Sequence, residues 1–354
     1  MENLHIYEKI GCDKINFRGF EVLKMNLKDI ESRKNVCVDH GGTQDFRRLS
    51  IVDGKMFHAL SVERRYEEGI LREETCLSIR IGEIAGNNLN LWSVNRYKKH
   101  LLDLSAYLLK NYNLAVDFSQ IRISTIEIGC NITLSSEYSA YQRSIRFIFN
   151  NLPKTLKLEM AAKKEEELES CIARNRQREF TIYNKRKELE DKHEETPEEE
   201  VMRIEYRLRT GQKVNETFNT DFLADITDDM IEKYFISTFQ KEIANAYLKW
   251  KQSNKRTLMN LVKELRRANP RRWQDNLLTK CRNSEQEFNR FLLLDIEDLF
   301  SVLKELEKNG NFRRTQKAIM SKLEQPDAFA HQSGEKISEI IDRVTLIYDS
   351  KKKE

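Results

Sequence analysis

The chain has 354 residues, with 61 Lys and Arg against 57 Asp and Glu, and a formal net charge of +4. This length exceeds that of an ordinary domain, so we expect two domains or one large elaborated domain. Only 12 Gly and 4 Pro are present, which excludes a collagen-like or linker-rich chain and favours long regular elements. Because the net charge is small, any surface that binds polyanions must be local.

The sequence predicts a cytoplasmic protein without structural metal or disulfides. No apolar run approaches the ~18 residues of a membrane span, and the first residues lack the basic and apolar regions of a signal peptide. The six Cys include no Cys-x-x-Cys pair, and no two of the six His lie within four residues of each other. We therefore expect reduced thiols and no zinc site.

Strand and helix signals alternate up to residue 220. Short strands are predicted at residues 16–25, 48–61 and 75–84, the second with a turn at Asp53-Gly54. Residues 92–114 carry leucines at helical spacing and are predicted as an amphipathic helix packed on a sheet. Further along, we expect strands at 126–134 and 201–208, helices at 136–150 and 185–195, and a hairpin of 171–174 and 178–184 around Asn175-Arg176.

The second part of the chain is predicted to be helical. Helical periodicity covers residues 228–251, 254–268, 285–308, 313–323 and 336–348, with breaks at Asn269-Pro270, Asn309-Gly310 and Gln325-Pro326. The fold class is therefore α+β: an antiparallel-sheet domain at residues 1–220, followed by a mainly α-helical domain at residues 221–354.

Three of the predicted strands carry a chemically useful residue opposite an apolar face. These residues are Glu127 on 126–134, Tyr183 on 178–184 and Glu205 on 201–208. If the strands are neighbours in one antiparallel sheet, the three side chains converge on the face that is not packed on the core. The alternative is that the carboxylates are merely solvated and the tyrosine packs in the sheet.

Two carboxylates and a phenol on one surface suit phosphodiester cleavage. Carboxylate oxygens bind Mg²⁺ or Mn²⁺, the cation polarises the phosphodiester, and the oxygen of Tyr183 attacks phosphorus. Lys185 would lower the pKa of the phenol or neutralise charge in the transition state. Glu188, a turn into the following helix, is a candidate third metal ligand or base.

Three motifs in order resemble those of phage and plasmid replication initiators, most closely the filamentous-phage gene-two protein group, and also the plasmid rolling-circle Rep proteins. The motifs are Thr-Ile-Glu-Ile-Gly-Cys-Asn at residues 125–131, Phe-Thr-Ile-Tyr-Asn-Lys-Arg-Lys-Glu-Leu at 180–189 and Met-Arg-Ile-Glu-Tyr-Arg-Leu at 202–208. Residues 122–208 carry the resemblance; the rest of the chain resembles these families only in length and layout.

The resemblance implies a rolling-circle replication initiator with a Rep-like nickase palm. Such an enzyme nicks one strand at an origin, stays joined to the 5′ phosphate through tyrosine, leaves a 3′ hydroxyl and later rejoins the displaced strand. By position, Tyr183 would be the nucleophile, Glu127 and Glu205 metal ligands, Lys185 a helper and Glu188 a further ligand. The His-hydrophobic-His pair of the wider HUH nickases is absent, and no second tyrosine lies close to Tyr183.

Basic residues mark two candidate DNA contacts. Residues 241–282 hold twelve Lys and Arg against three acidic residues, a local net charge of +9, with Trp250 and Trp273 among them. Trp250 is predicted to be a core residue, and Trp273 is equally compatible with core and with stacking. The candidate contacts near Tyr183 are Arg174, Arg176, Arg178, Lys187, Arg203 and Arg207; those in the helical domain are Arg266, Arg267, Arg271, Arg272, Arg313 and Arg314, the last two in a segment that resembles the start of a recognition helix.

The partners implied are duplex and single-stranded origin DNA, together with a helicase and a polymerase of a bacterial host cell. Two other functions remain open at this stage. A non-catalytic DNA-binding control protein of a plasmid or phage would need the basic helices but not Tyr183. A nickase of the transposase or relaxase type would share the chemistry but not the role.

Overall fold

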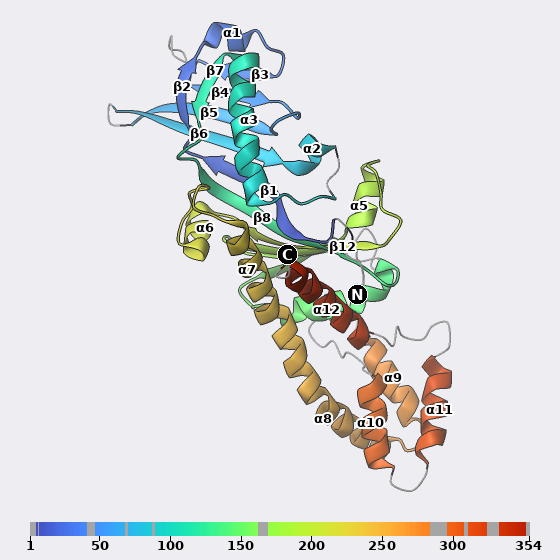
Figure 1. Cartoon of the computed structure of the whole chain (residues 1–354). Helices are drawn as coiled ribbons and strands as arrows, with labels where there is room; N and C mark the ends of the chain where they lie inside the picture. The colour runs from blue at the N-terminus through green and yellow to red at the C-terminus, as the bar shows by residue number, and fades with distance from the viewer. Residues whose placement is uncertain are drawn as a thin grey trace.

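A computed structural model describes residues 5, 7–40, 47–67, 70–86, 89–161, 169–283, 296–307, 311–323 and 333–351. The fold is α+β and is dominated by one large antiparallel sheet (Figure 1). The strands of this sheet are β1 (Ile10–Arg18), β3 (Val36–Asp39), β4 (Arg48–Val52), β5 (Ala59–Glu67), β6 (Ile70–Arg80), β8 (Arg122–Thr133), β9 (Lys157–Ala161), β10 (Ser170–Arg174), β11 (Arg178–Asn184) and β12 (Val201–Leu208). A separate ribbon pairs β2 (Glu21–Met25) with β7 (Leu114–Asp117).

The ten strands are arranged in the order β3-β4-β5-β6-β1-β8-β12-β11-β10-β9. Strands β8 and β12 therefore lie side by side near the centre, and β11 follows β12. The register places Glu127 opposite Arg207, and Glu205 between Gly129 of β8 and Thr181 of β11. Alternating apolar and polar residues give each of these strands one buried and one polar face.

Helices cover one face of the sheet. Helix α3 (Val94–Tyr112) lies over its N-terminal half, while α4 (Gln142–Asn151), α7 (Asp228–Phe239) and α12 (Ser333–Lys351) lie over the half formed by β8 to β11 (Figure 1). Ring contacts show this packing directly, because Tyr97 of α3 meets Phe17 of β1 and Phe235 of α7 meets Tyr206 of β12. The polar side chains of the same strands point to the other face of the sheet.

Shorter helices close the ends and connections of the sheet. They are α1 (Leu27–Glu31), α2 (Ile81–Ala85), the 3₁₀ helix η1 (Tyr138–Tyr141), α5 (Lys185–Asp191) and α6 (Gly211–Phe218). Helix α5 begins directly after β11, with Asn184 as its N-cap: the Asn184 side chain accepts a hydrogen bond from the backbone N–H of Lys187. This cap fixes the direction in which the chain leaves β11 next to Tyr183.

A small helical bundle lies away from the sheet, at the end of a long helix. Helix α7 continues through one π-helical turn, η2 (Gln240–Ala244), into α8 (Asn245–Ala268), which leads to α9 (Trp273–Asn283), α10 (Ile296–Leu306) and α11 (Phe312–Leu323) (Figure 1). The bundle has its own apolar cluster, which includes Leu258, Leu277 and Leu303. The apolar residues of α7 and α12 belong instead to the core of the sheet.

Most predicted elements are confirmed, including the hairpin of β10 and β11 and the alternation of β8 and β12. Three differ. The strand expected at residues 16–25 is broken at Gly19, whose φ of +72° turns the chain between β1 and β2. The helices expected at 228–251 and 254–268 form one continuous run. The helix predicted at 285–308 is described only from residue 296 to residue 307. Its first part, and the predicted break at Asn309-Gly310, lie outside the described residues.

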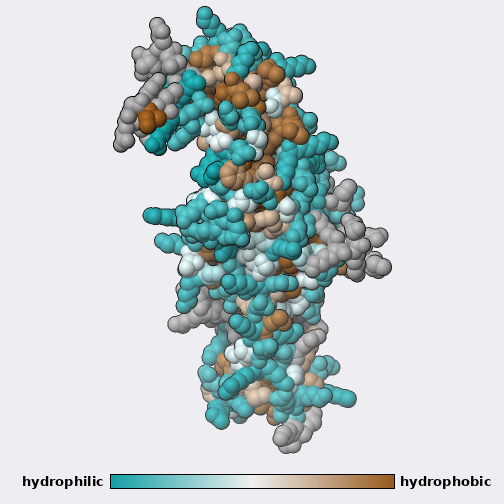
Figure 2. Space-filling model, turned by 60° about the vertical axis from the view of Figure 1, so that its left-hand side comes forward, coloured by the Kyte–Doolittle hydropathy of each residue, from teal (hydrophilic) through white to brown (hydrophobic). Residues whose placement is uncertain are grey.

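Two leucines of α3 that were predicted to pack on the sheet are exposed instead. Leu102 is 74% exposed and Leu109 is 51% exposed. Figure 2 shows apolar side chains to be denser in the upper half of the molecule, over the N-terminal half of the sheet. None of the described helices is both long enough and apolar enough to span a membrane.

Candidate active site

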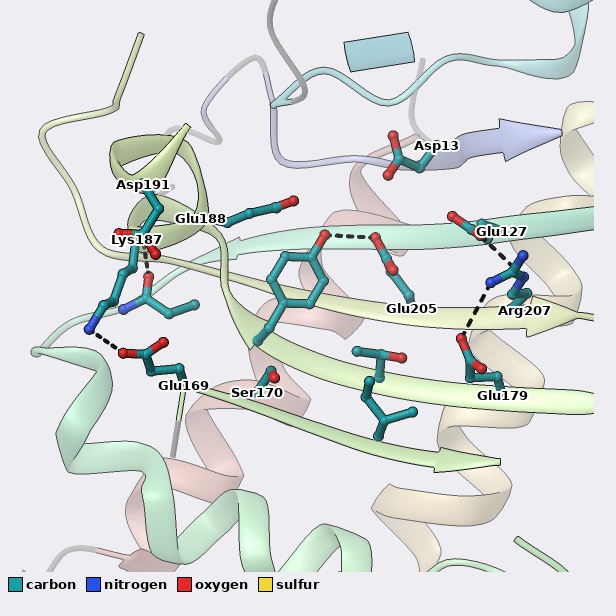
Figure 3. A pocket seen from close by; sticks show the side chains of 14 residues that line it. Asp13, Glu127, Glu169, Ser170, Glu179, Lys187, Glu188, Asp191, Glu205 and Arg207 are labelled. Carbon is teal, nitrogen blue, oxygen red and sulfur yellow. Dashed lines mark hydrogen bonds and ion pairs between the residues drawn. The ribbon is translucent and has the colours of Figure 1, made fainter. Parts of the chain in front are cut away.

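A pocket of about 460 Å³ opens on the polar face of the sheet, where β1, β8, β12, β11 and β10 meet the start of α5 (Figure 3). It brings together three residues that the sequence predicts as a site, Glu127, Tyr183 and Glu205. Acidic residues prevail in its lining: Asp13, Glu127, Glu169, Glu179, Glu188, Asp191 and Glu205. A pocket this rich in carboxylates favours binding of a cation, or of a ligand that binds together with a cation.

Tyr183 and Glu205 form the centre of the pocket. The Tyr183 hydroxyl donates a hydrogen bond of 2.9 Å to Oε1 of Glu205 (Figure 3). A Cβ at position 129 would lie 3.3 Å from Cγ of Glu205, so Gly129 leaves room for that side chain. Burial, followed by the negative charge of Glu205, raises the pKa of Tyr183 well above its ordinary value. The phenol is therefore protonated in the resting site.

Asp13 is the site residue that the sequence analysis missed. It lies on β1, at an irregularity where the register to β8 shifts between Cys12 and Lys14. Its side chain is 14% exposed and faces the same pocket as Glu127 and Glu205 (Figure 3). Because the irregularity interrupts the alternation of β1, periodicity alone gives no signal for this residue.

The carboxylates of the pocket repel one another. Burial, together with Asp13 and Glu127, raises the pKa of Glu205 to about 8. Burial also raises the pKa of Glu127, although Arg207 opposes this by an ion pair of 3.1 Å. A bound cation would relieve this repulsion and favour the charged form of Glu205.

Arg203 lies on the same face of β12 as Glu205, two residues before it, and is fully buried. Its Nε donates to Oδ1 of Asn131 at 2.6 Å, and one Nη donates to the carbonyl of Leu89 at 3.1 Å. The guanidinium also lies 3.2 Å from Asp13 and 3.7 Å from Glu205. The sequence analysis assigned Arg203 to DNA, but a fully buried guanidinium does not reach a phosphate at the surface, so we assign it to the support of the pocket instead.

Lys185 and Glu188 form an ion pair beside the pocket. Nζ of Lys185 lies 2.6 Å from Glu188 and 5.6 Å from the centre of the Tyr183 ring. Burial and the neighbouring Arg203 lower the pKa of Lys185 to about 8. Although burial alone would raise it, Lys185 and Lys192 lower the pKa of Glu188 to about 2. Both oxygens of Glu188 are thus held by lysines.

The donor set fits a hard divalent cation. Asp13, Glu127 and Glu205 offer only oxygen ligands from three adjacent strands, the kind that Mg²⁺ and Mn²⁺ prefer. Within the described part of the chain, no three Asp, Glu, His or Cys side chains are already drawn together as a metal cluster. Glu127 instead forms an ion pair with Arg207, and Glu205 accepts a hydrogen bond from Tyr183.

The other basic residues predicted near Tyr183 lie in different settings. Lys187 and Arg207 line the pocket, where they pair with Glu169 and with Glu127. Arg176 is exposed at the tip of the β10–β11 hairpin, and Arg174 on β10 pairs with Glu159 at 2.6 Å.

Arg178 lies on the helical side of the sheet, where it pairs with Glu242 at 2.8 Å. It shares that face of β11 with Phe180 and Ile182, two residues and four residues further along. The sequence analysis placed Arg178 with the positive charge around Tyr183. It lies on the opposite side because the position is even in a strand whose odd positions face the pocket.

The basic residues of the helical part meet at one end of the bundle. Arg267, Arg271 and Arg272 are exposed around the α8–α9 turn, and Arg313 and Arg314 are exposed in the first turn of α11. A pocket of about 550 Å³ lies between these turns and includes Arg266, Trp273 and Arg314 in its lining.

The two tryptophans considered for stacking are both packed in the fold. Trp273 is 7% exposed and lies under the guanidinium of Arg266, at 4.4 Å from the ring centre. Trp250 packs on Phe147 and Tyr247, as expected of a core residue.

Comparisons with known proteins complete the description. No protein-family model matches the sequence, and no curated protein sequence matches it. Among solved structures, the chain is similar to a rolling circle replication initiator protein from Geobacillus stearothermophilus, with a TM-score of 0.33 and 8% identity over 66% of this chain and 84% of that one. The function below is therefore argued from the geometry of the pocket.

Proposed function

We propose that the chain is a rolling-circle DNA replication initiator, a metal-dependent enzyme that nicks one strand of origin DNA at a specific site through a covalent 5′-phosphotyrosine. The observation that supports this most is the hydroxyl of Tyr183 donating to Glu205, inside a pocket that also holds Asp13 and Glu127. A phenol that faces a set of carboxylate oxygen ligands has the parts that a metal-dependent tyrosine nuclease needs.

In the proposed reaction the oxygen of Tyr183 attacks a phosphodiester phosphorus, and the bond from phosphorus to the 3′ oxygen breaks. Glu205 accepts the hydrogen bond of the phenol in the resting site, and the phenolic proton passes to water when Glu205 serves as a ligand of the cation. The departing 3′ oxygen takes a proton from water and becomes the hydroxyl that primes synthesis. The reverse attack by a 3′ hydroxyl on the phosphotyrosine rejoins a strand.

Mg²⁺ or Mn²⁺ would supply Lewis-acid polarisation of the phosphate and would favour the ionised phenol. We propose Asp13, Glu127 and Glu205 as its ligands, with Asp13 in place of Glu188, because Glu188 is held by Lys185 and Lys192. Lys185 has the role of an electrostatic helper, since its ammonium lies beside the ring of the nucleophile.

The basic end of the bundle is proposed to hold the origin duplex. Exposed arginines of the α8–α9 turn and of α11 lie together there, and phosphate contacts of this kind give salt-dependent affinity. Host helicase and polymerase would then act on the nicked product. The proposed boundary between a nicking domain and a helical DNA-binding domain at residues 220 and 221 stays a prediction.

The test is a nicking assay with Mn²⁺ or Mg²⁺ and a supercoiled plasmid that carries the candidate origin. Wild-type protein is expected to yield nicked DNA joined covalently to protein, and Tyr183→Phe is expected to yield none. Tyr206→Phe is the matched control, because Tyr206 lies on the opposite face of the neighbouring strand β12 and its buried hydroxyl has no hydrogen-bond partner among the described residues.

Two results would contradict the proposal. A covalent adduct that persists in Tyr183→Phe would show that another residue is the nucleophile. Wild-type protein that binds the origin but leaves it intact with either metal would support the non-catalytic control protein instead.

A further inference from the structure

A row of polar side chains runs from the acidic pocket along strands β1 and β8, on the same face of the sheet. Lys14 is opposite Glu127, Asn16 is opposite Thr125, and Arg18 is opposite Arg122. Side-chain hydrogen bonds tie the middle of the row, because Asn16 donates to Thr125 and accepts from Ser78 of β6, each at 2.7 Å. The row is therefore continuous in structure with the pocket.

A second pocket, of about 610 Å³, lies at the far end of this row. Arg18 and Arg122 line it, and both guanidiniums are held by one carboxylate, Asp221, at 3.0 and 3.6 Å. The carboxylate is 9% exposed, while the arginine side chains are 49% and 46% exposed. The carboxylate thus fixes the guanidiniums from beneath and leaves much of each at the surface.

An aromatic ring completes the second pocket. The segment that contains Phe222 pairs with the end of β8 opposite Arg122, and the Arg122 guanidinium lies 4.1 Å from the centre of the Phe222 ring. A half-buried ring with a stacked guanidinium offers a flat surface to a base. The rest of the lining is mainly uncharged and polar, apart from Asp225, which accepts a hydrogen bond from Thr220.

We propose that single-stranded DNA held at Tyr183 follows β1 and β8 and that one of its nucleotides binds in the second pocket. This proposal rests on the proposed function. The phosphate contacts the guanidiniums of Arg18 and Arg122, and the base stacks on the pair formed by Arg122 and Phe222. We refer to Arg18, Arg122 and Phe222 as the strand-end site.

The dimensions and the charge of the row suit a single strand. Glu127 and Arg122 are five positions apart on β8, a span of roughly 17 Å at the usual rise of a strand. Along it, Lys14 of β1 and Arg80 of β6 lie opposite each other and add positive charge. Combining basic groups with an aromatic surface is how proteins bind single strands without reading their sequence.

The experiment measures binding of a fluorescent oligodeoxythymidylate of about 12 nucleotides by anisotropy over a series of salt concentrations. All proteins carry Tyr183→Phe, so that no cleavage occurs. Arg122→Gln is expected to weaken binding about tenfold and to reduce the slope of log K against log salt by about 0.7, the loss of one phosphate contact. Phe222→Leu is expected to weaken binding about tenfold with the slope unchanged, because stacking releases no counterions.

Lys110→Gln is the matched control for charge. Lys110 is exposed on α3, which covers the opposite face of the sheet, so its loss is expected to change neither affinity nor slope. Arg122→Gln leaves Arg18 paired with Asp221, and a melting temperature close to that of the parent protein will confirm that it folds. If Phe222→Leu does not fold, the affinity and salt slope of Arg122→Gln alone test the strand-end site.

Parent-like affinity and slope in Arg122→Gln overturn the strand-end site. This outcome is separable from failure of the proposed function, because binding is measured without cleavage. If wild-type protein nicks its origin while Arg122→Gln binds like the parent, only the strand-end site fails. If no nicking is found but Arg122→Gln and Phe222→Leu weaken binding as described, the strand-end site stands as a single-strand DNA site.

Discussion

Arg203 balances the charge of two carboxylates of the pocket. Its guanidinium is fully buried, and it lies 3.2 Å from Asp13 and 3.7 Å from Glu205. Removing one partner of a buried ion pair leaves the other charge uncompensated, at a cost of about 3–5 kcal/mol. We expect Arg203→Gln to lower the free energy of unfolding by this amount, measured by urea denaturation.

Arg207→Gln is the control for this prediction. Arg207 pairs with Glu127 in the same pocket, but its side chain is 29% exposed, so water compensates for much of the loss. We expect a decrease of about 1 kcal/mol or less. Equal decreases in the free energy of unfolding of the two variants would show that burial of Arg203 gives it no special role in stabilising the pocket.

The choice of Asp13 over Glu188 as a ligand gives a second prediction at the scale of single residues. Asp13→Asn is expected to weaken Mn²⁺ binding at least tenfold, because a charged oxygen ligand is lost from the carboxylate set. Glu188→Gln is expected to change the affinity for Mn²⁺ less than threefold, because both Glu188 oxygens already accept hydrogen bonds from Lys185 and Lys192. Titration of Mn²⁺ followed by electron paramagnetic resonance measures both. The reverse order of effects would restore Glu188 as the ligand.

Sequence alternation was sufficient to bring Glu127, Tyr183 and Glu205 to one face, because β8, β12 and β11 are regular neighbours. It was not sufficient for Asp13, where an irregular register interrupts the period of two. For Arg203 it predicted the correct face but the wrong environment. Carbonyls of distant segments, such as that of Leu89, cover this end of the face, and no local pattern shows such a contact.

At the scale of elements, α12 is fastened to the sheet by a polar cluster. Lys336 donates to Ser135 at 2.9 Å, and Glu339 accepts from Tyr141 at 2.5 Å and from the backbone of Ser135 at 2.8 Å. Lys336 and Glu339 also pair with each other at 3.0 Å. This cluster joins the last helix to the end of β8, some 200 residues earlier in the chain.

The cluster predicts a pH dependence of stability. Although burial alone would raise it, hydrogen bonds from Tyr141 and Ser135 lower the pKa of Glu339. A carboxyl whose pKa is lower in the folded state contributes stability above the unfolded value of about 4.3. That contribution is lost as the pH falls through the folded value. Glu339→Gln is therefore expected to lower the melting temperature at pH 7 and to reduce its decline below about pH 4.3.

Glu216→Gln is the control for the pH prediction. The pKa of Glu216 is also lowered, chiefly by a hydrogen bond from Lys213, but the pair lies exposed on a single helix. Such a pair contributes little to stability. The measurement is the melting temperature of both variants from about pH 3 to about pH 8. The same change from the parent protein in both variants would contradict the prediction.

The elements themselves were largely predictable, because caps, turns and alternation are local. The hairpin of β10 and β11 turns at Asn175, whose side chain accepts hydrogen bonds from the backbone of Gln177 and Arg178. The exposure of Leu102 and Leu109 on α3 was not predictable, because the width of the contact with the sheet depends on neighbouring strands. A leucine at helical spacing shows that a face is apolar, not that it is covered.

At the scale of the whole molecule, the two largest apolar clusters of the described residues are linked mainly through α8. The larger cluster joins the sheet to α3, α7 and α12, and the smaller one lies within α8 to α11. Because regions with separate cores open separately, the bundle is expected to have its own local stability. Helical periodicity in the sequence predicted a helical second part, but not that its first and last helices pack on the sheet.

This organisation gives a prediction for hydrogen exchange. Leu303 is fully buried in the bundle cluster, so Leu303→Ala is expected to cost about 2–5 kcal/mol there. Amides of α9, α10 and α11 will then exchange faster, while those of β8 and β12 keep their rates, because their protection depends on the other cluster. Ile204→Ala, at an equally buried position of β12, is expected to give the opposite pattern. If Leu303→Ala accelerates exchange in β12 as much as in α10, the two clusters open as one unit.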